Sequence, residues 1–405
     1  MLDVEALRRD YPILDRKMYG RPLVYLDNTA TSQTPRQVVE AVSEMYTAHK
    51  ANVHRGVFFL SQEATDLMER TRDKVRQYIN AADRSEVIFT RGTTEGINLV
   101  ASSYGQLLED GDEIILTQME HHANIVPWQL LQQRKAVKIK VVPILADGSL
   151  DLEAYRAMFT DRTRLVAFCH ISNVLGTVNP VREMVAYAHS KGCLALVDGA
   201  QAAPHLRIDV QDFGADFYAF SSHKMYGPTG IGVLYGRREL LEKMPPYQGG
   251  GEMIKHVSFS GTTFEEPPLK FEAGTPDFVG IAAFSACLDY IQSIGIQEIE
   301  AHELDLLHYC TAQMEQIPGM RIFGTAAGKA PVISFLIGHA HHYDTGMLLD
   351  KLGVAVRTGH HCAQPLMEAL GIEGTVRASF ALYNTREEVD LFIAALHRIL
   401  PLLGA

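Results

Sequence analysis

From residue 86 onward, short apolar segments alternate with stretches of helical periodicity, and this alternation restricts the possible folds more than any other feature of the chain. The segments expected to be strands are almost continuously apolar, which is typical of strands that are covered on both faces. We expect strands near 86–90, 113–118, 138–144, 164–172, 194–198, 217–221 and 231–235, and helices near 94–104, 123–135, 151–159 and 180–191. Strands separated by helices in this way predict an α/β fold with a mostly parallel sheet.

The pattern changes after this region. Residues 244–276 are rich in glycine and proline, and they predict an irregular crossing segment. The remaining elements are two helices near 277–293 and 296–316, followed by strands near 332–337, 354–358 and 375–379 with helices between them. Because a chain of 405 residues exceeds the usual size of one domain, we expect a large domain at 17–276 and a smaller α/β domain formed by 1–16 and 277–405.

Charge and composition disfavour several classes of protein. A formal net charge of −11 argues against nucleic-acid binding or attachment to an anionic membrane as the main role. No run of about eighteen apolar residues occurs, and the first residues lack the basic and apolar regions of a signal peptide. The five cysteines are scattered without a Cys-x-x-Cys pair, which is typical of a reducing compartment. We therefore expect a cytoplasmic protein.

One lysine follows directly after a predicted buried strand. The apolar run at 217–220 ends in Ser221-Ser222-His223-Lys224, and glycine and proline then prevent a regular continuation. A lysine that is removed from water has a lowered pKa and can act as a nucleophilic amine, as a Schiff base with a carbonyl cofactor requires. The alternative for a single lysine is a side chain that extends from the strand end to solvent.

Two other predicted strand ends carry groups that suit a phosphate-bearing cofactor. Asp198 ends the strand at 194–198, and the carboxyl ends of such strands face the ligand-binding crevice of open α/β sheets. After the strand at 86–90, Gly92-Thr93-Thr94 begins a helix. Free N–H groups at a helix start, together with threonine hydroxyls, bind anions. Each signal is weak alone, and the three in this order are strong.

Histidines and cysteines are less specific. The adjacent pairs at 121–122, 341–342 and 360–361 point in different directions, and no cysteines stand at zinc-like spacings, so we expect no metal site. Cys169 and His170 are neighbours on a predicted strand and face opposite sides, so we expect a core cysteine and a histidine at the rim. Cys362 lies on a polar, glycine-containing segment before a predicted helix and near Arg357, a setting that favours the thiolate. A single cysteine is more often core filling.

The motifs together resemble one family over almost the whole chain. They are Arg91-Gly92-Thr93-Thr94-Glu95, Glu120-His121-His122-Ala123-Asn124, Asp198-Gly199-Ala200-Gln201, Ser221-Ser222-His223-Lys224 and Arg357-Thr358-Gly359-His360-His361-Cys362-Ala363. The chain is similar to fold-type I pyridoxal-phosphate enzymes, specifically the SufS-type (group II) cysteine desulfurases, also called selenocysteine lyases, of the class V aminotransferase family. The resemblance implies a homodimer with shared active sites and pyridoxal 5′-phosphate as cofactor.

The resemblance also implies roles for individual residues. Lys224 would carry the cofactor, Asp198 would pair with its ring nitrogen, Gln201 would contact O3′, and His121 would stack on the ring and move protons. The cofactor phosphate would be bound by Thr93, Thr94, Ser221 and His223, with Thr275 of the partner chain. Asn173 would lie near O3′ and the substrate carboxylate. The substrate-binding residues would further include Arg357 as the carboxylate clamp, Arg377, and His54 and Arg55 at the dimer-facing mouth.

The implied reaction converts L-cysteine to L-alanine and leaves the sulfur on Cys362 as a persulfide for an acceptor protein of the SufE or SufU type, with iron–sulfur cluster assembly as the destination. L-selenocysteine would be an alternative substrate. One rival keeps the fold but changes the reaction, as in an aminotransferase, a kynureninase-like hydrolase or a β-lyase, none of which needs Cys362. A second rival is a sulfur-relay or scaffold protein without turnover.

Overall fold

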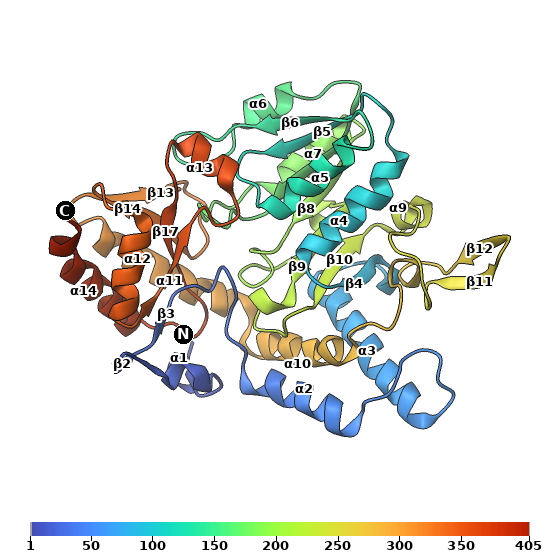
Figure 1. Cartoon of the computed structure of the whole chain (residues 1–405), viewed down its shortest axis with the longest axis horizontal. Coiled ribbons are helices and arrows are strands. Elements are labelled where there is room, and N and C mark those ends of the chain that lie inside the picture. The colour runs from blue at the N-terminus through green and yellow to red at the C-terminus, as the bar shows by residue number, and fades with distance from the viewer. Residues whose placement is uncertain (1, 405) are drawn as a thin grey trace.

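The computed structural model describes residues 2–404 and contains two large sheets of different construction, besides three two-stranded ones (Figure 1). The larger sheet has seven strands in the order β4-β10-β9-β8-β7-β5-β6. They are β4 (Val87–Thr90), β5 (Glu113–Thr117), β6 (Lys138–Val142), β7 (Thr163–Cys169), β8 (Leu194–Asp198), β9 (Phe217–Ser221) and β10 (Gly232–Gly236). Only β10 runs against its neighbours, β9 and β4. The expected mostly parallel sheet and α/β fold are confirmed.

Helices cover both faces of this sheet because successive strand residues point in opposite directions. Ile114 and Leu116 belong to the buried cluster of the helices α4 and α5, whereas Ile115 belongs to the cluster of α3, α7 and α10. The helices of this part are α2 (Arg36–Ala48), α3 (Phe59–Tyr78), α4 (Thr93–Ser103), α5 (Val126–Gln132), α6 (Leu152–Ala157), α7 (Val181–Ser190), α8 (Val210–Phe213), α9 (Arg238–Lys243) and α10 (Phe278–Ile294). The strands are therefore buried on both sides, and their polar ends are the places where a ligand can reach them.

The smaller sheet is antiparallel, with the order β13-β14-β17-β16, and has its own buried apolar cluster. Its strands are β13 (Met320–Phe323), β14 (Val332–Ile337), β16 (Arg357–Gly359) and β17 (Thr375–Ser379). Beside it, β3 (Val24–Tyr25) pairs in parallel with β15 (Val354–Ala355). The remaining elements are α1 (Val4–Arg8), β1 (Lys17–Met18), β2 (Arg21–Pro22), α11 (Ile296–Met314), α12 (His342–Lys351), α13 (Gln364–Leu370) and α14 (Arg386–Leu403). The segment 17–26 thus adds a strand next to the C-terminal sheet.

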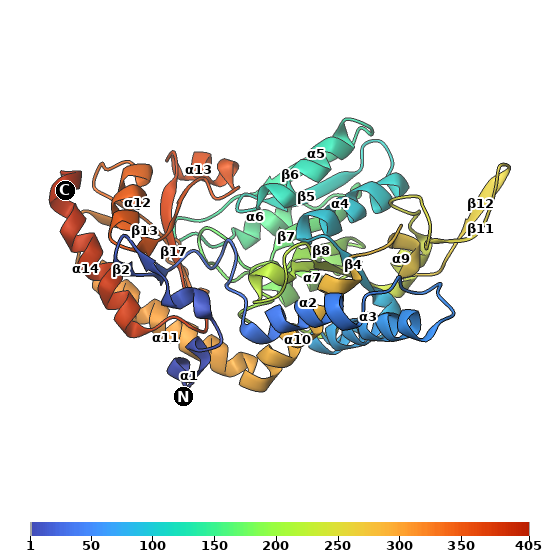
Figure 2. The same cartoon turned by 60° about the horizontal axis from the view of Figure 1, so that its bottom comes forward.

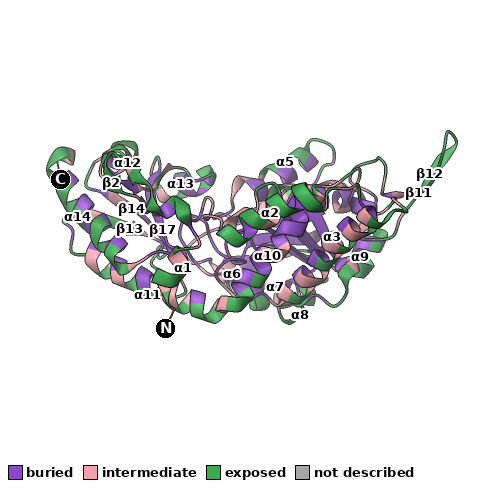
Figure 3. Ribbon diagram, turned by 90° about the horizontal axis from the view of Figure 1, so that it is seen from below, coloured by how far each residue is buried: buried purple, intermediate pink, exposed green. Residues whose placement is uncertain are grey.

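The expectation of an irregular segment at 244–276 is wrong in part. There β11 (Ile254–Ser258) and β12 (Gly261–Phe264) form an antiparallel hairpin. It projects from the body of the molecule and is almost entirely exposed (Figures 2 and 3). The β-branched pair Thr262-Thr263 favours a strand, but the glycines and prolines that flank the hairpin concealed this signal.

Within residues 2–404, no single helix has both the length and the apolar character needed to cross a membrane. The pair α10 and α11 reaches that length and composition only when the two helices are taken together, and they are bent by 74° at their break.

Candidate active site

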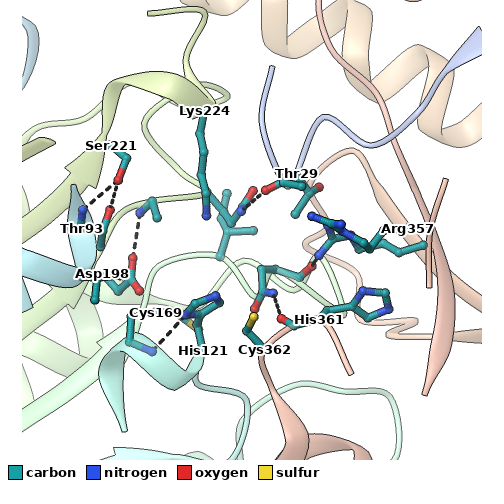
Figure 4. Close-up of a pocket in the computed structure, with 18 of the residues that line it drawn as sticks. Thr29, Thr93, His121, Cys169, Asp198, Ser221, Lys224, Arg357, His361 and Cys362 are labelled. Carbon is teal, nitrogen blue, oxygen red and sulfur yellow. Dashed lines mark hydrogen bonds between the residues drawn. The ribbon is translucent and has the colours of Figure 1, made fainter. Parts of the chain in front are cut away.

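A cavity of about 600 Å³ lies between the carboxyl ends of the parallel strands and the loop that follows β16 (Figure 4). Its wall includes side chains from the large sheet, from β17 and from this loop. Of the residues predicted from the sequence, it is lined by Thr93, Thr94, His121, Asn173, Asp198, Gln201, Ser221, His223, Lys224, Arg357, Cys362 and Arg377. Segments that are far apart in the chain therefore meet around one space.

Lys224 follows β9 and extends into the cavity (Figure 4). Desolvation lowers the pKa of its amine, and the nearby Asp198 carboxylate opposes this effect only in part. His121 also lies on the wall, and burial lowers its pKa to about 3, so the ring is neutral near pH 7. The backbone N–H of Ala123 donates to Nδ1 of His121 at 3.0 Å, which assigns the ring proton to Nε2. The cavity thus contains an amine of reduced basicity and a neutral imidazole.

Asp198 ends β8 and is 5% exposed. Its Oδ1 accepts a hydrogen bond from the N–H of Ala200 at 2.9 Å, and burial raises the pKa of the carboxyl group. A buried carboxylate is stabilised by a cationic partner. Gln201, in the following turn, donates from Nε2 to the carbonyl oxygen of Thr29 at 2.8 Å.

The start of α4 forms a second polar corner of the cavity. The N–H of Thr93 donates to Oγ of Ser221 at 2.8 Å, and the two hydroxyl oxygens are 2.7 Å apart. Strand β10 passes so close that a Cβ on Gly232 would lie 2.3 Å from Cα of Gly92. Backbone N–H groups and hydroxyls at the start of a helix of this length are suited to a phosphate.

The loop after β16 carries Cys362, which is exposed. His361 and Cys362 both have φ of 55°, in the left-handed region that side chains other than glycine seldom adopt. Two hydrogen bonds join the loop to the large sheet: the carbonyl oxygen of Cys362 accepts from the N–H of His122 at 2.7 Å, and that of His361 accepts from Nδ2 of Asn173 at 2.8 Å. The strained backbone is therefore held from the opposite wall.

The two predicted substrate-binding arginines differ in their surroundings. The Arg377 side chain is 3% exposed, and its Nη1 donates to the carbonyl oxygen of Asn173 at 2.9 Å. Its Nε is buried and has no hydrogen-bond partner among the described residues. The Arg357 side chain is 53% exposed. Asp27 lies between them, 3.5 Å from Nε of Arg357 and 3.4 Å from Nη2 of Arg377.

Three predicted site residues are not in this cavity. Thr275 is exposed and lines a separate cavity of about 320 Å³ together with Phe89 and Glu272. His54 and Arg55 contact acidic side chains on the surface, with Nε of Arg55 3.1 Å from Oε1 of Glu252. Within one chain, these three residues do not line the cavity that contains Lys224 and Cys362.

The expectation for Cys169 and His170 is confirmed for the cysteine, which is buried in the core, and is wrong for the histidine, which does not lie at the rim. Cys169 lines the cavity, whereas the His170 ring is buried, 3.0 Å from the hydroxyl of Tyr218 and edge-on to Phe213. The His170 ring is covered by Tyr218 of β9 and by Phe213 of α8, so it does not reach the rim. Burial lowers the pKa of His170 to about 4.

Several site residues were not identified from the sequence. Asp27, between the arginines, was visible as a carboxylate directly after an apolar strand. Thr29 lines the cavity with a buried Oγ1 that has no hydrogen-bond partner among residues 2–404. Glu120 is fully buried next to His121; its carboxylate accepts from Thr117 Oγ1, from Asn124 Nδ2 at 2.8 Å and from the Cys169 N–H at 3.0 Å. Burial raises the pKa of Glu120 to about 7.

Across the described chain, no group of three or more His, Cys, Asp and Glu side chains is placed to hold a metal ion. The expectation that the protein has no metal site stays a prediction.

Comparison with known proteins identifies the family. The class V aminotransferase model matches residues 24–392. The cysteine desulfurase of Serratia proteamaculans (strain 568) is 50% identical over 403 residues, which are 99% of each chain. The cysteine desulfurase of Yersinia pestis (strain Pestoides F) is 51% identical over 403 residues, again 99% of each chain.

Solved structures agree in fold over the full length. The cysteine desulfurase CsdA of Escherichia coli, in its S-sulfonic acid form, is 41% identical, with a TM-score of 0.92 and complete coverage of both chains. The apo cysteine desulfurase of Thermococcus onnurineus NA1 is 40% identical, with a TM-score of 0.95, covering 100% of this chain and 99% of the other. The resemblance inferred from the motifs is confirmed: the chain belongs to the class V aminotransferase family and, within it, to the cysteine desulfurases.

Proposed function

We propose that this protein converts L-cysteine to L-alanine and transfers the sulfur to Cys362 as a persulfide. The observation that carries this proposal is that a desolvated lysine and an exposed cysteine line the same cavity, although they come from opposite walls. Neither the aminotransferase nor the β-lyase reaction needs the cysteine.

The residues of the cavity fit pyridoxal 5′-phosphate, the cofactor of this family. The buried Asp198 carboxylate suits a protonated ring nitrogen, and the corner formed by Thr93 and Ser221 suits a phosphate. We assign Thr94 and His223 to the same phosphate, Gln201 to O3′, and His121 to the face of the ring. When bound, the cofactor supplies an electron sink that acidifies the substrate Cα–H and weakens the Cβ–S bond.

The protein's own groups then divide the work. Because its pKa is lowered, the Lys224 amine can both carry the cofactor and take the Cα proton. The Cys362 thiolate attacks the substrate sulfur, so that an S–S bond forms while the Cβ–S bond breaks. The electron pair of the broken bond stays with the substrate, which takes up a proton and leaves as alanine. A reductant or an acceptor thiol must later remove the persulfide sulfur.

The resemblance implies Arg357 as the clamp on the substrate carboxylate. Because the Arg377 side chain is buried and that of Arg357 is exposed, we assign Arg377 instead as the main anchor, with Arg357 and Asn173 as its neighbours. The partnerless buried Nε of Arg377 can donate to an incoming carboxylate, and burial strengthens such a contact. The exposed Arg357 side chain can turn toward the same group from the mouth of the cavity.

The test is to measure alanine and sulfide from L-cysteine, with a thiol reductant, for the wild type and for Cys362→Ala. We expect alanine from the wild type and almost none from the variant, while both proteins bind the cofactor equally. Equal turnover in both would contradict the desulfurase assignment and support a β-lyase or an aminotransferase. We propose L-selenocysteine as a second substrate, because its selenium leaves more readily than sulfur does. If Cys362→Ala keeps its turnover only with L-selenocysteine, the release of selenium does not need the thiol.

We further propose a homodimer in which Thr275 reaches the partner's cofactor phosphate while His54 and Arg55 border the partner's cavity. In support, these residues lie outside their own chain's cavity. Large apolar side chains are also exposed nearby: Val57 and Phe59 follow Arg55 in the sequence, and Phe259 lies at the turn of the hairpin β11–β12. Such surfaces are typical of an interface. Sedimentation equilibrium tests this proposal, and a monomer at micromolar concentration would contradict it.

The remaining parts of the proposal concern cell context. We propose a SufE- or SufU-type acceptor, delivery to iron–sulfur cluster assembly, and a cytoplasmic location. Only two residues separate Gly359 from Cys362, so the loop that carries the thiol is short. A short loop favours sulfur transfer to an acceptor protein that docks on the enzyme rather than to small thiols in solution. Persulfide transfer to small thiols at the rate seen with such a protein would contradict this. We also propose the division stated above into a cofactor domain (17–276) and a domain that carries Cys362 (1–16 and 277–405), with two exceptions. β3 pairs with β15 of the second domain, and α10 packs in the buried cluster of the first.

A further inference from the structure

One face of α3 holds a loop that lies outside the cavity. Ser61 Oγ donates to the carbonyl oxygen of Asn52 at 2.6 Å, and Thr65 Oγ1 accepts from the N–H of His54 at 2.8 Å. One turn further on, Oε1 of Glu69 lies 3.3 Å from Nε2 of His54. The spacing of four residues places these three side chains in a row along the helix, so the loop 52–55 is fastened to α3 over two turns.

The next residue on that face fastens a second segment. Arg72 is 1% exposed and makes two hydrogen bonds to Glu272, at 2.7 and 2.9 Å, while its Nε donates to Glu69 at 3.0 Å. Arg72 also donates to the carbonyl oxygen of Val87, and Glu272 accepts from the N–H of Phe89, both at 2.7 Å. Because β4 is an edge strand, this ion pair satisfies backbone groups that no other strand pairs with.

A third contact closes the arrangement into a ring. The N–H of Gly274 donates to the carbonyl oxygen of Gly251 at 3.0 Å, and the neighbouring Glu252 contacts Arg55 at 3.1 Å and His54 at 3.7 Å. His54 and Glu252 have φ of 66° and 67°. Both residues therefore have a left-handed backbone, and their side chains face each other. Such a backbone is kept only by its surroundings, and this kind of strain concentrates at functional sites.

We propose that Glu69 and Arg72 are positioning residues that hold the loop 52–55 and the segment 272–275 in one fixed relation, so that both meet the partner chain's active site as a unit. This inference rests on the proposed shared site. A buried ion pair is a poor source of net stability compared with apolar packing, but its bidentate geometry fixes the direction of the segment it holds. Thr275 follows Glu272 by three residues and is exposed, ready to contact another chain.

Hybrid dimers separate this role from a merely structural one. In the first hybrid, one chain carries Lys224→Ala and Glu69→Ala, and the other is wild type. Only the wild-type chain can link the cofactor, and its site receives the loop 52–55 and the segment 272–275 from the altered chain. In the second hybrid, one chain carries Lys224→Ala and the other carries Glu69→Ala, so that site receives intact segments. The readout is the affinity of the apo hybrid for pyridoxal phosphate, followed by the visible absorbance of the lysine-linked cofactor.

We expect the dissociation constant to rise by roughly tenfold in the first hybrid, because a charge-assisted contact to the phosphate is misplaced. The second hybrid should stay within about twofold of the hybrid without Glu69→Ala, as for most changes at partly exposed positions. The matched control is Asp66→Ala, which removes an exposed carboxylate from the same helix. It should leave the affinity for pyridoxal phosphate unchanged in both hybrids. Glu69→Gln should restore part of the affinity, and it replaces the alanine variant if that chain does not fold.

Equal effects of Glu69→Ala in both hybrids would overturn the proposal, because a structural role does not depend on which chain carries the working site. Thr275→Val in the same two arrangements tests separately the assumption that Thr275 contributes to the partner chain's site. A loss of affinity in the first arrangement for Thr275→Val but not for Glu69→Ala would leave the shared site standing and reject the positioning role. No loss for either variant, or a protein that does not dimerise, would reject the shared site itself.

Discussion

The two walls of the cavity differ in the backbone that carries their reactive groups. On one wall, Asp198 ends β8 and Lys224 follows β9, two parallel strands that are buried on both faces. On the other, Cys362 lies on a short loop with two consecutive left-handed residues and an exposed side chain. The first wall removes charged groups from water, which shifts their pKa values, whereas the second leaves its thiol accessible.

This difference matches the two parts of the proposed reaction. Proton transfer benefits from an amine of lowered pKa in a fixed position, and fixed positions are what a sheet provides. A thiol that accepts sulfur from a substrate and then passes it to another molecule must be reached from two sides. The predictions below separate the two walls, in order of decreasing effect.

The largest effect is expected on the sheet wall, for Lys224→Ala. Turnover of L-cysteine should fall by about 10⁴-fold, because the general base and the cofactor attachment are lost together. Lys329→Ala is the matched control: burial lowers the pKa of Lys329 to about 8, but this lysine lies outside the cavity. Equal losses of activity in both variants would mean that desolvated lysines matter here only for folding.

Glu120 gives the sheet wall a dependence of stability on pH. Its folded-state pKa of about 7 lies above the ordinary value of 4.5, so the folded protein retains a proton that the unfolded chain loses as pH rises. The penalty is absent below pH 4.5 and complete above pH 7. Relative to Glu120→Gln, the wild-type apoprotein should therefore lose about 3 kcal/mol of unfolding free energy as pH rises across this window. Denaturant unfolding at pH 4 and pH 8 measures it, and a constant difference would contradict the assignment.

The arginines should respond unequally to conservative replacement. Arg377→Lys should lower kcat/KM for L-cysteine by roughly 10- to 100-fold, because the fork-shaped contact to the substrate carboxylate and to Asn173 is lost in a buried position. Arg357→Lys should cost less than about tenfold, since its side chain is exposed and its attraction is screened by water. The reverse order would assign the carboxylate to Arg357.

The smallest effect compares two thiols that line the same cavity. Cys169→Ala should lower the free energy of unfolding by about 1 kcal/mol, because the thiol is buried and its removal leaves a small void. Cys362→Ala should change it by less than about 0.5 kcal/mol, since the side chain is exposed. A large loss for Cys362→Ala would indicate that the loop contributes to folding as well as to chemistry.

Part of this site could be predicted because strand ends are visible in a sequence. Apolar runs that stop at Asp198 and at Ser221 identified the carboxylate Asp198 and the lysine Lys224 as candidate site residues. The pair Gly92-Thr93 indicated the start of a helix. Asp27 and Glu120 were not assigned roles, because their importance depends on partners that are distant in the chain: Arg377 for Asp27, and the Cys169 N–H for Glu120. Local pattern carries no information about such partners.

The chain by itself determined the strands of the large sheet in chain order, the lysine at a buried strand end and the family motifs, because periodicity and short spacings are local properties. Only the tertiary structure decided which arginine is buried, that Cys169 rather than His170 lines the cavity, and that α3 ties the loop 52–55 to the segment 272–275. Those outcomes depend on where strands end and which surfaces meet. Burial and long-range contact are produced by packing, so they exist only once the whole chain has folded.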